Sequence, residues 1–470
     1  MAGEPIDFTV STLGEARVPS PVELSRSLGD FVANYVDDAA RIIYDVDVST
    51  DGGEYCVDDS ELLQKAGPRE HIYFPAARVH AGVVTCGGLC PGINDVIRAL
   101  TRCLWYQYGV RRITGIPFGY HGLLPECTTD TVRLDPSYVD DIHKIGGTCL
   151  GSSRGGGERT SEIVDSLERM NLNMLFCIGG DGTQKGALAI AEEVERRGLK
   201  IAVVGIPKTI DNDLSFIQKS FGFETAVSIA SGTVTAAHTE AHSAMNGIGL
   251  VKLMGRDSGF IAAHTALACH EANFVLIPEV PFELEGEYGL FAQVRKRLER
   301  RNHAVIIVAE GAGQDLLEAS GTADASGASA TARTAGTEQT DRRNGNTSKG
   351  TDASGNRRYG DIGVFLRERL REYFATEGIN INLKYIDPSY IIRSAVAVPT
   401  DSVYCSRLGN NAVHAAMAGK TKVLISLVNN QFVHVPIRVA VGSRSTVDPE
   451  SSLWRDVVES TQQPIRMTRS

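Results

Sequence analysis

A segment that could bind a polyphosphate occupies residues 179–183, with the sequence Gly-Gly-Asp-Gly-Thr. It lies between a predicted strand, 175–178, and a helix expected from residue 184, so the free N–H groups at the helix start would face bound phosphates. Its one carboxylate, Asp181, could hold Mg²⁺ directly or through a water molecule. A tight turn whose aspartate caps the helix would have the same sequence, and only the other motifs favour phosphate binding.

A second polar segment, Pro-Lys-Thr-Ile-Asp-Asn-Asp at 207–213, follows directly after a predicted strand that ends at residue 206. An alcohol that attacks a γ-phosphoryl group needs a carboxylate to accept its proton and cations to spread the developing charge. We therefore predict Asp211 as the general base, and we expect Asp213 to orient Lys208 or a water molecule. The alternative is a turn rich in Asp and Asn without catalytic function.

Two glycine-rich loops could surround the same phosphates. The loop 86–92, Cys-Gly-Gly-Leu-Cys-Pro-Gly, joins a predicted strand to an amphipathic helix, and the loop 152–157, Ser-Ser-Arg-Gly-Gly-Gly, places the cation of Arg154 among small residues. Neither loop is specific by itself, because the first is not GxGxxG and a lone arginine is commonly a surface residue. Cys86 and Cys90 have no second Cys/His pair nearby, which favours buried thiols over a metal site.

Three later segments could hold a sugar phosphate. Met-Gly-Arg at 254–256 and Glu-Gly at 310–311 each end a predicted strand, and the segment 384–393 supplies cations and a phenol at a third strand end. Arginine and lysine would bind the phosphate, and Glu310 would accept hydrogen bonds from hydroxyls. Each segment alone could equally form a structural ion pair.

The elements that would position these motifs alternate in the order of an α/β fold. From residue 79 onward, short β-branched apolar runs end at turn signals and are followed by amphipathic stretches, as in the βα units of a parallel sheet. The expected strands are 81–85, 113–117, 173–178, 200–206, 248–254, 273–277, 304–309 and 423–427. Such sheets carry ligands at the carboxyl ends of their strands, where the motifs lie. We predict two lobes of mostly parallel sheets flanked by helices.

The chain divides into an extension, two lobes and a tail. Residues 1–78 are acidic, show only a modest helical pattern over 28–44, and are expected to pack on the catalytic body. We predict an ATP and Mg²⁺ lobe over 79–245, with chain returning from the C-terminal part, a sugar-phosphate lobe over 246–440, and a tail over 441–470. The stretch 319–357 has almost no large apolar residues, so it is expected to be a disordered insertion, inert rather than regulatory.

The composition narrows the class of protein. A net charge of −10 excludes a protein that coats nucleic acid or an acidic membrane. No apolar stretch reaches the ~18 residues of a membrane span, and the start of the chain lacks the pattern of a signal peptide. Nine cysteines scattered through expected helices and strands fit a reducing compartment. We expect a cytoplasmic protein whose partners are small molecules, with no nucleic acid or membrane among them.

With these motifs in this order, residues 79–439 resemble the phosphofructokinase family, and most closely its ATP-dependent branch found in plants and trypanosomatids. Gly-Gly-Asp-Gly, Thr-Ile-Asp-Asn-Asp, Met-Gly-Arg and the late Tyr-to-Arg segment carry the resemblance. It implies a two-lobed α/β fold and an allosteric enzyme of glycolysis, usually a homotetramer. The implied reaction transfers the γ-phosphoryl group of MgATP to the 1-hydroxyl of fructose 6-phosphate.

The resemblance also implies roles for individual residues. Asp181 would bind Mg²⁺ and Asp211 would take the hydroxyl proton. The residues implied to bind ATP are Gly88, Arg154, Gly155, Gly180, Asp181, Gly182 and Thr183. Those implied to bind the sugar phosphate are Thr209, Ile210, Asp211, Met254, Gly255, Arg256, Glu310, Lys384, Tyr390, Ile391, Ile392 and Arg393.

Two positions bear on the phosphoryl donor. In the pyrophosphate-using enzymes of the family an aspartate stands where this chain has Gly182, and it fills the space that an ATP α-phosphate would occupy. Lys208 favours pyrophosphate instead, because the pyrophosphate enzymes carry lysine at this position and many bacterial ATP enzymes carry glycine. The plant-like ATP branch combines glycine with lysine, so we expect ATP.

The chain departs from its bacterial relatives at two positions. These positions bear on two properties of the bacterial enzymes: the half of the substrate site that the neighbouring subunit supplies, and the response to effectors. Bacterial relatives carry an arginine where this chain has Gly247, and a histidine where it has Tyr390.

Three alternative functions share part of this pattern. A pyrophosphate-dependent phosphofructokinase would share every motif except Gly182. A non-catalytic regulatory subunit is expected to lack the metal or base carboxylate, yet Asp181 and Asp211 are both present. NAD or lipid kinases also use Gly-Gly-Asp-Gly, but they lack the Met-Gly-Arg and Tyr-to-Arg segments.

Overall fold

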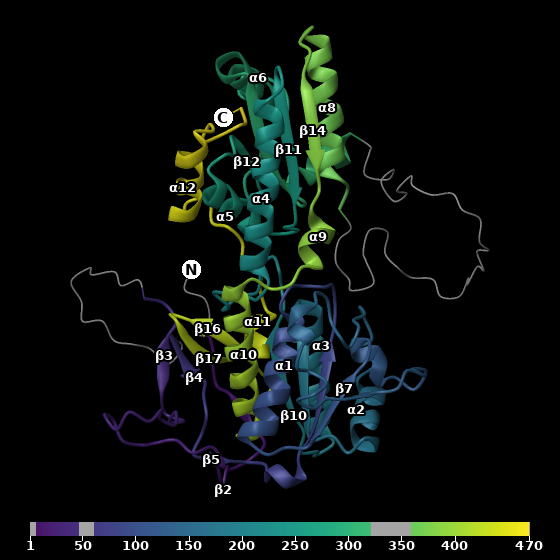
Figure 1. The fold of residues 1–470 in the computed structure, drawn as a ribbon, viewed down its shortest axis with the longest axis vertical. Helices are drawn as coiled ribbons and strands as arrows, with labels where there is room; N and C mark the ends of the chain where they lie inside the picture. The colour runs from purple at the N-terminus through teal and green to yellow at the C-terminus, as the bar shows by residue number, and fades with distance from the viewer. Residues whose placement is uncertain (1–5, 47–60, 321–358, 470) are drawn as a thin grey trace. The chain divides into compact units, whose positions relative to one another are not determined.

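The computed structural model describes residues 6–46, 61–320 and 359–469, and these fall into two compact units (Figure 1). Unit 1 comprises residues 1–226 and 390–445, and unit 2 comprises residues 227–389 and 446–470. Each unit is described by itself. The structure therefore places residues 390–440, which the sequence prediction put in the sugar-phosphate lobe, with unit 1. The predicted insertion 319–357 lies almost entirely outside the described residues.

Unit 1 is built on a nine-stranded sheet in the order β3-β4-β17-β16-β10-β9-β6-β7-β8. The run β16-β10-β9-β6-β7 is parallel, and antiparallel strands extend it at both edges. The strand bounds are β3 Arg41–Ile43, β4 Leu62–Lys65, β6 His80–Thr85, β7 Arg112–Ile116, β8 Val132–Arg133, β9 Met174–Gly179, β10 Ala202–Pro207, β16 Val423–Val428 and β17 Gln431–Pro436. Two small antiparallel pairs, β1 Ser11–Thr12 with β15 Lys420–Thr421 and β2 Val18–Pro19 with β5 His71–Ile72, complete the strands.

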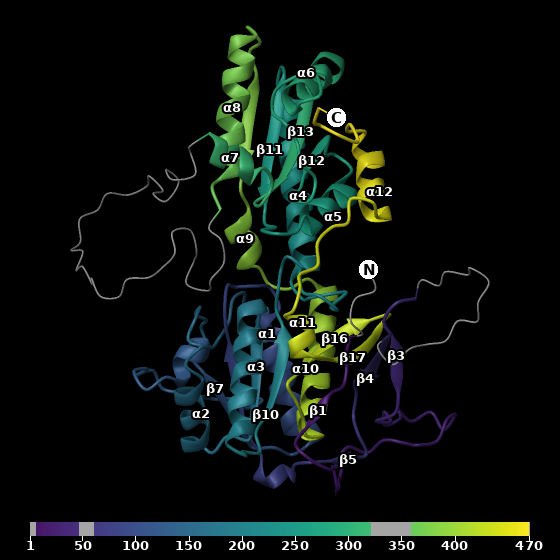
Figure 2. The same ribbon diagram turned by 180° about the vertical axis from the view of Figure 1, so that it is seen from behind.

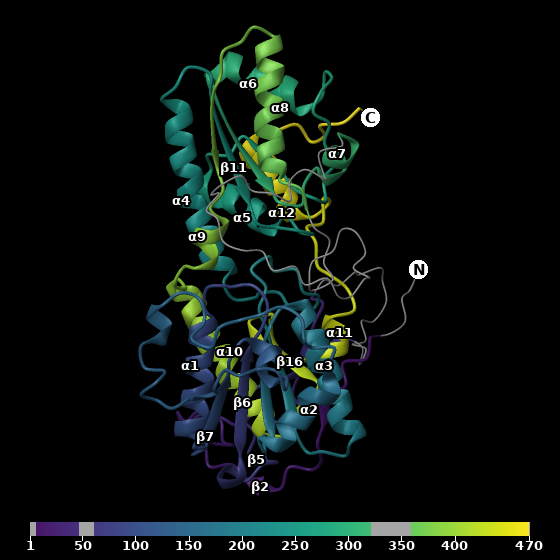
Figure 3. The same cartoon turned by 90° about the vertical axis from the view of Figure 1, so that its right-hand side faces the viewer.

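Helices cover both faces of this sheet (Figure 3). They are α1 Ile93–Arg102, α2 Thr160–Arg169, α3 Asp181–Arg196, α10 Pro399–Met417 and α11 Ile437–Ala440. Alternate side chains of β9 enter different cores: Phe176 and Ile178 pack with α1 and α10, whereas Leu175 and Cys177 pack with α2 and α3. Because helices cover both faces of the sheet, the sequences of β9 and β10 are continuous apolar runs and do not alternate between apolar and polar residues.

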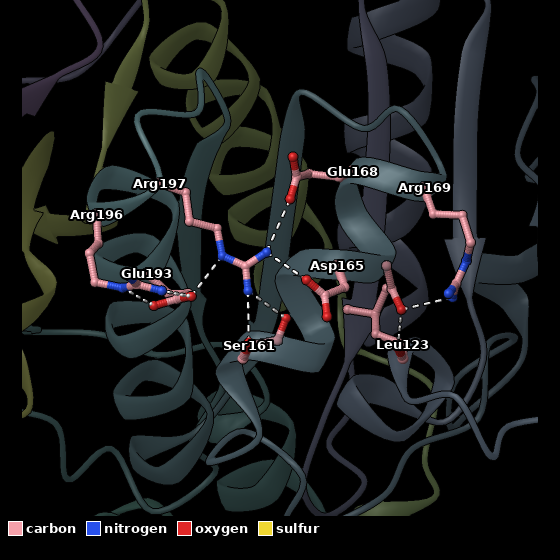
Figure 4. A network of polar contacts seen from close by, with 9 residues as sticks. Leu123, Ser161, Asp165, Glu168, Arg169, Glu193, Arg196 and Arg197 are labelled. Carbon is pink, nitrogen blue, oxygen red and sulfur yellow. Dashed lines mark hydrogen bonds and ion pairs between the residues drawn. The ribbon is translucent and has the colours of Figure 1, made fainter.

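An ion-pair network joins α2 to α3 (Figure 4). Arg197, directly after α3, donates to Glu193 at 2.7 Å, and its Nη1 reaches Asp165 at 2.6 Å and Glu168 at 3.1 Å on α2. Hydrogen bonds from Arg196 and Arg197 lower the pKa of Glu193 to about 2. The network ties the end of α3 to a neighbouring helix, while the start of α3 bears the Gly-Gly-Asp-Gly segment.

The N-terminal extension is part of the sheet rather than a separate layer. β3 pairs with β4, and β4 pairs with β17. The modest helical pattern over 28–44 does not give a helix, and all of those residues are described. The physical reason is that Leu28 and Phe31 are fully exposed, so no apolar face is buried to stabilise a helix there.

A polar cluster holds the extension to the sheet. Asp38 accepts hydrogen bonds from Arg69 Nε at 2.9 Å and Lys420 Nζ at 2.8 Å, and both cations are almost fully buried. Burial raises the pKa of Asp38, but the hydrogen bonds from Lys420 and Arg69 outweigh it and lower the pKa to about 2. The two cations thus share one partly exposed carboxylate.

Asp38→Asn is expected to lower the free energy of unfolding at pH 7 by about 1–2 kcal/mol, a figure discounted because the carboxylate is partly solvated. A carboxyl with a depressed folded pKa stabilises the fold above its unfolded pKa, and this contribution disappears as the pH falls through about 2. Urea unfolding at pH 7 and pH 3 should therefore show a smaller difference between Asp38→Asn and wild type at pH 3. Glu23→Gln, the same loss of charge on the exposed surface of the extension, is the control; an equal loss in both variants would contradict the assignment.

Unit 2 contains a parallel four-stranded sheet in the order β12-β13-β11-β14. The strands are β11 Gly247–Leu253, β12 Phe274–Leu276, β13 His303–Ala309 and β14 Asn382–Ile386. The helices are α5 Phe260–Cys269, α6 Leu290–Arg301, α7 Gln314–Ala319, α8 Ile362–Thr376 and α12 Ser452–Thr461, and α12 packs beside α5 (Figure 2). α4 Phe223–His242 and α9 Ser389–Arg393 each cross a boundary between the units.

Glycines in β11 allow α4 to pack closely. A Cβ at Gly247 would lie 2.0 Å from the Ala241 carbonyl oxygen, and one at Gly249 would lie 2.9 Å from that of Ala237. A side chain at 247, where bacterial relatives have arginine, could not be accommodated without moving the helix. This departure from the bacterial pattern is therefore built into the packing of unit 2.

All eight strands expected from the sequence are present, each displaced by no more than a few residues at its ends. The additional strands of the main sheets are β14 and β17 together with the short edge strands β3, β4 and β8. The mixed α/β architecture with large, mostly parallel sheets flanked by helices is confirmed.

Candidate active site

The carboxyl ends of three neighbouring strands meet at one edge of the unit 1 sheet. β6, β9 and β10 are parallel, with Thr85 opposite Ile178 and Gly179 opposite Pro207. The loops that follow these strands therefore emerge side by side. They are the segments 86–92, 180–183 and 208–213, which the sequence selected independently.

The start of α3 follows β9 after a single residue. Gly180 precedes the helix, and Asp181 is its first residue. A Cβ at Gly182 would meet nothing within 4 Å, so the space beside this exposed position is open. Thr183 is buried, and Tyr120 donates to its carbonyl oxygen at 2.7 Å. The backbone N–H groups of this first turn can thus accept an anion without a side chain in the way.

Lys208 joins two of the loops. Its Nζ donates to the Gly88 carbonyl oxygen at 2.7 Å, and its backbone N–H donates to the Gly179 carbonyl oxygen at 3.0 Å. A Cβ at Gly88 would lie 3.9 Å from Nη2 of Arg154, so loop 152–157 reaches the same place. Gly155, with φ of 79°, adopts the left-handed conformation that glycine favours.

Three cations gather around this edge. Burial lowers the pKa of Lys208, and the charges of Arg393 and Arg154 lower it further. A polyphosphate bound beside these loops would place its negative charge close to the three cations. The arrangement fits a polyphosphate.

The loop after β10 is held by its own side chains. Thr209 donates to Asp213 at 2.5 Å, and the Asn212 side chain accepts from the Ser220 backbone N–H at 2.7 Å. Asn212 has φ of 56°, a left-handed conformation that asparagine tolerates better than most residues. These bonds fix the backbone on both sides of Asp211. The Ile210 side chain is half-buried and packs against the apolar core.

Of the two roles expected for Asp213, orienting Lys208 is wrong, because no hydrogen bond joins the two side chains, and orienting a water molecule stays a prediction. Asp213 accepts from Thr209, while the ammonium group of Lys208 donates to the Gly88 carbonyl oxygen. The geometry explains this, because a side chain at the strand end reaches the neighbouring loop more easily than it folds back along its own loop.

Arg444 is a residue of this site that the sequence did not reveal. Its guanidinium nitrogens lie 3.9 Å from the Asp181 carboxylate and 3.8 Å from that of Asp213. Asp181 also accepts from Lys185 at 2.9 Å, one turn along α3. Arg444 lies far along the chain after α11, in no recognisable motif, and an antiparallel bridge to Leu214 and a hydrogen bond from Ser445 N–H to the Asp213 carbonyl oxygen bring it here.

In unit 2, the predicted sugar-phosphate residues meet at the carboxyl ends of β11 and β13. Glu310 N–H donates to the Leu253 carbonyl oxygen at 2.9 Å, and Gly311 N–H donates to that of Gly255 at 2.9 Å. Met254 is buried, and Gly255 has φ of 128°. The structure thus brings Met254, Gly255, Arg256 and Glu310 together.

The last predicted segment, residues 384–393, is divided between the two units. Lys384 lies within β14 opposite Gly249, not at the strand end that the prediction gave it, because the strand continues to Ile386. Ile392 is fully buried, whereas Tyr390 and Ile391 are exposed. Residues 390–393 belong to unit 1, where the Arg393 charge acts on Lys208.

Comparison with known proteins identifies this arrangement. A family model described as "Phosphofructokinase" matches residues 80–416. The chain belongs to the phosphofructokinase family. This confirms the resemblance inferred from the motifs, and the match begins where the extension ends.

Relatives within the family are similar over most of the chain. The "ATP-dependent 6-phosphofructokinase" of Borreliella burgdorferi is 53% identical over 99% of this chain and 98% of its own length. The protein of the same name from Trypanosoma cruzi is 46% identical over 85% of this chain and 76% of its own length. Arabidopsis thaliana proteins with ATP-dependent 6-phosphofructokinase names are 42–46% identical. The likeness to plant and trypanosomatid members is therefore confirmed.

Solved phosphofructokinase structures share the fold. The crystal structure of a protein named pyrophosphate-dependent phosphofructokinase from Marinobacter aquaeolei superposes with a TM-score of 0.62, and it covers 82% of this chain and 91% of that chain. Its sequence identity is 20%, so the comparison establishes the fold alone.

The carboxylates of this family member fit one mode of Mg²⁺ binding. Within the described ranges, no cluster of three or more His, Cys, Asp or Glu side chains could hold a metal ion. Mg²⁺ in phosphoryl-transfer sites is commonly held by one or two carboxylates together with water and substrate phosphates. Asp181, partly exposed at the helix start, fits that mode.

The eight cysteines in the described part of the phosphofructokinase chain are free thiols, in agreement with the expectation of unpaired cysteines. Burial raises the pKa of Cys86 and Cys90 to about 12, so both are protonated near neutral pH. Among the described residues, no helix combines the length and apolar character that crossing a membrane requires.

Proposed function

We propose that this member of the family transfers the γ-phosphoryl group of ATP to the 1-hydroxyl of fructose 6-phosphate, giving ADP and fructose 1,6-bisphosphate. The observation that carries the proposal is the meeting of the three strand-end loops at one edge of the unit 1 sheet. They supply an open helix start at Gly182, the cation of Lys208 and the carboxylate of Asp211. The names of the full-length relatives support the same reaction.

In the reaction, the oxygen of the 1-hydroxyl attacks the γ-phosphorus while the bond from that phosphorus to the β–γ bridging oxygen breaks. Asp211 accepts the hydroxyl proton, and ADP leaves with the bridging oxygen. The loop bonds on either side of Asp211 hold the backbone that carries this carboxylate before substrate binds, which reduces the cost of orienting it. Lys208 and Arg154 would stabilise negative charge on the transferring group.

The nucleotide is held by Gly88, Arg154, Gly155 and the start of α3 from Gly180 to Thr183. Asp181 is the residue that would hold Mg²⁺, and the bound ion would neutralise charge on the phosphate oxygens. To do so, Asp181 must exchange its partners Lys185 and Arg444 for the ion. Lys185 is exposed, so it can turn toward solvent when that exchange occurs.

The residues that the family implies for fructose 6-phosphate are Thr209, Ile210, Tyr390, Ile391, Ile392 and Arg393 in unit 1, and Met254, Gly255, Arg256 and Glu310 in unit 2. In unit 2, Arg256 would bind the phosphate and Glu310 would accept hydrogen bonds from sugar hydroxyls. Ile392 would act through its backbone, because its side chain is fully buried. Lys384, the further phosphate contact that the family implies, lies within β14.

Two further properties are expected, the assembly from the family and the compartment from the cysteine thiols. A homotetramer is the expected assembly, which the mass of the native particle in solution checks. A reducing, cytoplasmic compartment is the expected location, since the described cysteines are unpaired.

The test is an assay of ATP with Mg²⁺ against fructose 6-phosphate, fructose, glucose 6-phosphate and NAD as separate acceptors. ADP should form at a substantial rate with fructose 6-phosphate alone, and phosphorus NMR of the product should show a second phosphate on carbon 1. ADP formation with NAD but not with fructose 6-phosphate would overturn the proposal.

A further inference from the structure

The chain re-enters the described part of unit 2 at residues 359–361, which we call the return segment, immediately after the undescribed residues 321–358. Its sequence is Tyr-Gly-Asp. None of these residues belongs to a motif selected from the sequence. In the structure, Tyr359 contacts Arg256 of the predicted sugar-phosphate site, and Gly360 and Asp361 bond to residues close to it in the fold.

Tyr359 contacts two consecutive residues after β11. The Arg256 guanidinium lies over its ring, 5.3 Å from the ring centroid, and its hydroxyl donates to the Asp257 carboxylate. An arginine cation over an aromatic face is attracted by the ring quadrupole, more strongly where water is partly excluded. Both Arg256 and Tyr359 are half-buried. The ring thus constrains the arginine, and the hydroxyl fixes the ring.

The backbone of Arg256 is constrained from another side. A Cβ at Gly311 would lie 1.6 Å from the Arg256 carbonyl oxygen, so the two backbones touch and only glycine fits. With its backbone against Gly311 and its side chain against Tyr359, Arg256 is held at both ends. This matters because a long arginine side chain otherwise loses substantial rotamer freedom when it binds a phosphate.

The other two residues of the return segment hold Tyr359 in place. Gly360 exchanges two hydrogen bonds with the Gln314 side chain, at 3.0 and 3.1 Å, and Gln314 also donates to the Glu310 carbonyl oxygen at 2.8 Å. Asp361 accepts from Lys252 of β11 at 3.0 Å and from the first turn of α8. The return segment therefore bonds to residues next to both Glu310 and Arg256.

We propose that Tyr359 is a positioning residue for fructose 6-phosphate, which orients Arg256 for the sugar phosphate before substrate binds. This inference rests on the proposed function, in which Arg256 binds that phosphate. Because Tyr359 acts on the pre-organisation of the acceptor site, its loss affects acceptor binding, and the site at the unit 1 strand ends keeps its own geometry.

The experiment measures KM for fructose 6-phosphate, KM for ATP and kcat in Tyr359→Leu and Tyr359→Phe. Tyr359→Leu removes the ring and should raise KM for fructose 6-phosphate about tenfold, with KM for ATP and kcat within twofold of wild type. Tyr359→Phe keeps the ring and should raise that KM by about threefold or less. Tyr106→Leu is the control, since Arg102 lies 5.1 Å from the Tyr106 ring centroid in unit 1, a similar pair on the surface.

A double-mutant cycle identifies the residue through which Tyr359 acts. In an Arg256→Met background, which lacks the cation, Tyr359→Leu should add little to KM for fructose 6-phosphate. An unchanged KM in Tyr359→Leu, a fall in kcat alone, or full additivity with Arg256→Met would each overturn the inference. If Tyr359→Leu fails to fold, Tyr359→Phe and the cycle built on it decide. If the wild-type protein were inactive with fructose 6-phosphate, that result would instead contradict the proposed function.

Discussion

Replacing Asp211 by asparagine should lower kcat by about 10²–10⁴-fold, the usual contribution of general acid–base catalysis. Asparagine keeps the shape of the side chain but cannot accept the proton of the sugar hydroxyl. The Thr209–Asp213 bond and the Asn212 conformation do not involve the Asp211 carboxylate, so the loop should keep its geometry. Steady-state assays give kcat, and calorimetric titration with ATP should give a Kd within about threefold of wild type.

The control for this loss of charge is Asp130→Asn, at an exposed position of unit 1 outside the site. Its kcat should equal that of wild type. A kcat in Asp211→Asn within tenfold of wild type would remove Asp211 from proton transfer.

Gly182→Asp should reduce kcat/KM for ATP by about a thousandfold. The added carboxylate would occupy the open space at the start of α3 and face phosphate oxygens of the same sign, at a cost of about 4 kcal/mol for charges 4 Å apart near a protein surface. The fold should be retained, because an acidic residue in the first turn of a helix is favourable. Assays at several ATP concentrations measure the effect.

Gly182→Ala separates charge from size. Gly182 is not among the residues with positive φ, so alanine fits without backbone strain, and it raises helix propensity. Its kcat/KM for ATP should stay within about tenfold of wild type. Equal losses in the alanine and aspartate variants would show that the glycine is required for close approach of the backbone and that charge at this position does not set donor use.

The strands of both sheets could be predicted because their patterns are local. β9 and β10 are buried on both faces, so their sequences are unbroken apolar runs that end at turn residues. The glycine-rich and Asp-containing segments after them could be recognised because phosphate chemistry requires those residue types at strand ends. The parallel order of the sheet then places the loops together without further information.

Contacts between segments far apart in the chain could not be predicted. Arg444 reaches Asp181 and Asp213 only because residues 390–445 return to unit 1. Tyr359 reaches Arg256 from beyond a long segment with no apolar pattern. In both cases the local sequence is ordinary, and the function of the residue comes from the partner that the fold gives it.

In the N-terminal extension, a local sequence pattern indicated a structure that the fold does not contain. A weak helical period over 28–44 predicted local structure, but the tertiary contacts of β3 and β4 and the bonds of Asp38 determine the conformation instead. Helical patterns of this strength need a buried apolar face to form a helix. Leu28 and Phe31 do not supply one, because both are fully exposed.

The most direct test of the account compares ATP with pyrophosphate as separate phosphoryl donors to fructose 6-phosphate, with and without Mg²⁺, in the wild-type enzyme. The open space at Gly182 predicts rapid formation of fructose 1,6-bisphosphate with ATP and Mg²⁺, and little or none with pyrophosphate or without the ion. Rapid phosphorylation with pyrophosphate and none with ATP would contradict the account.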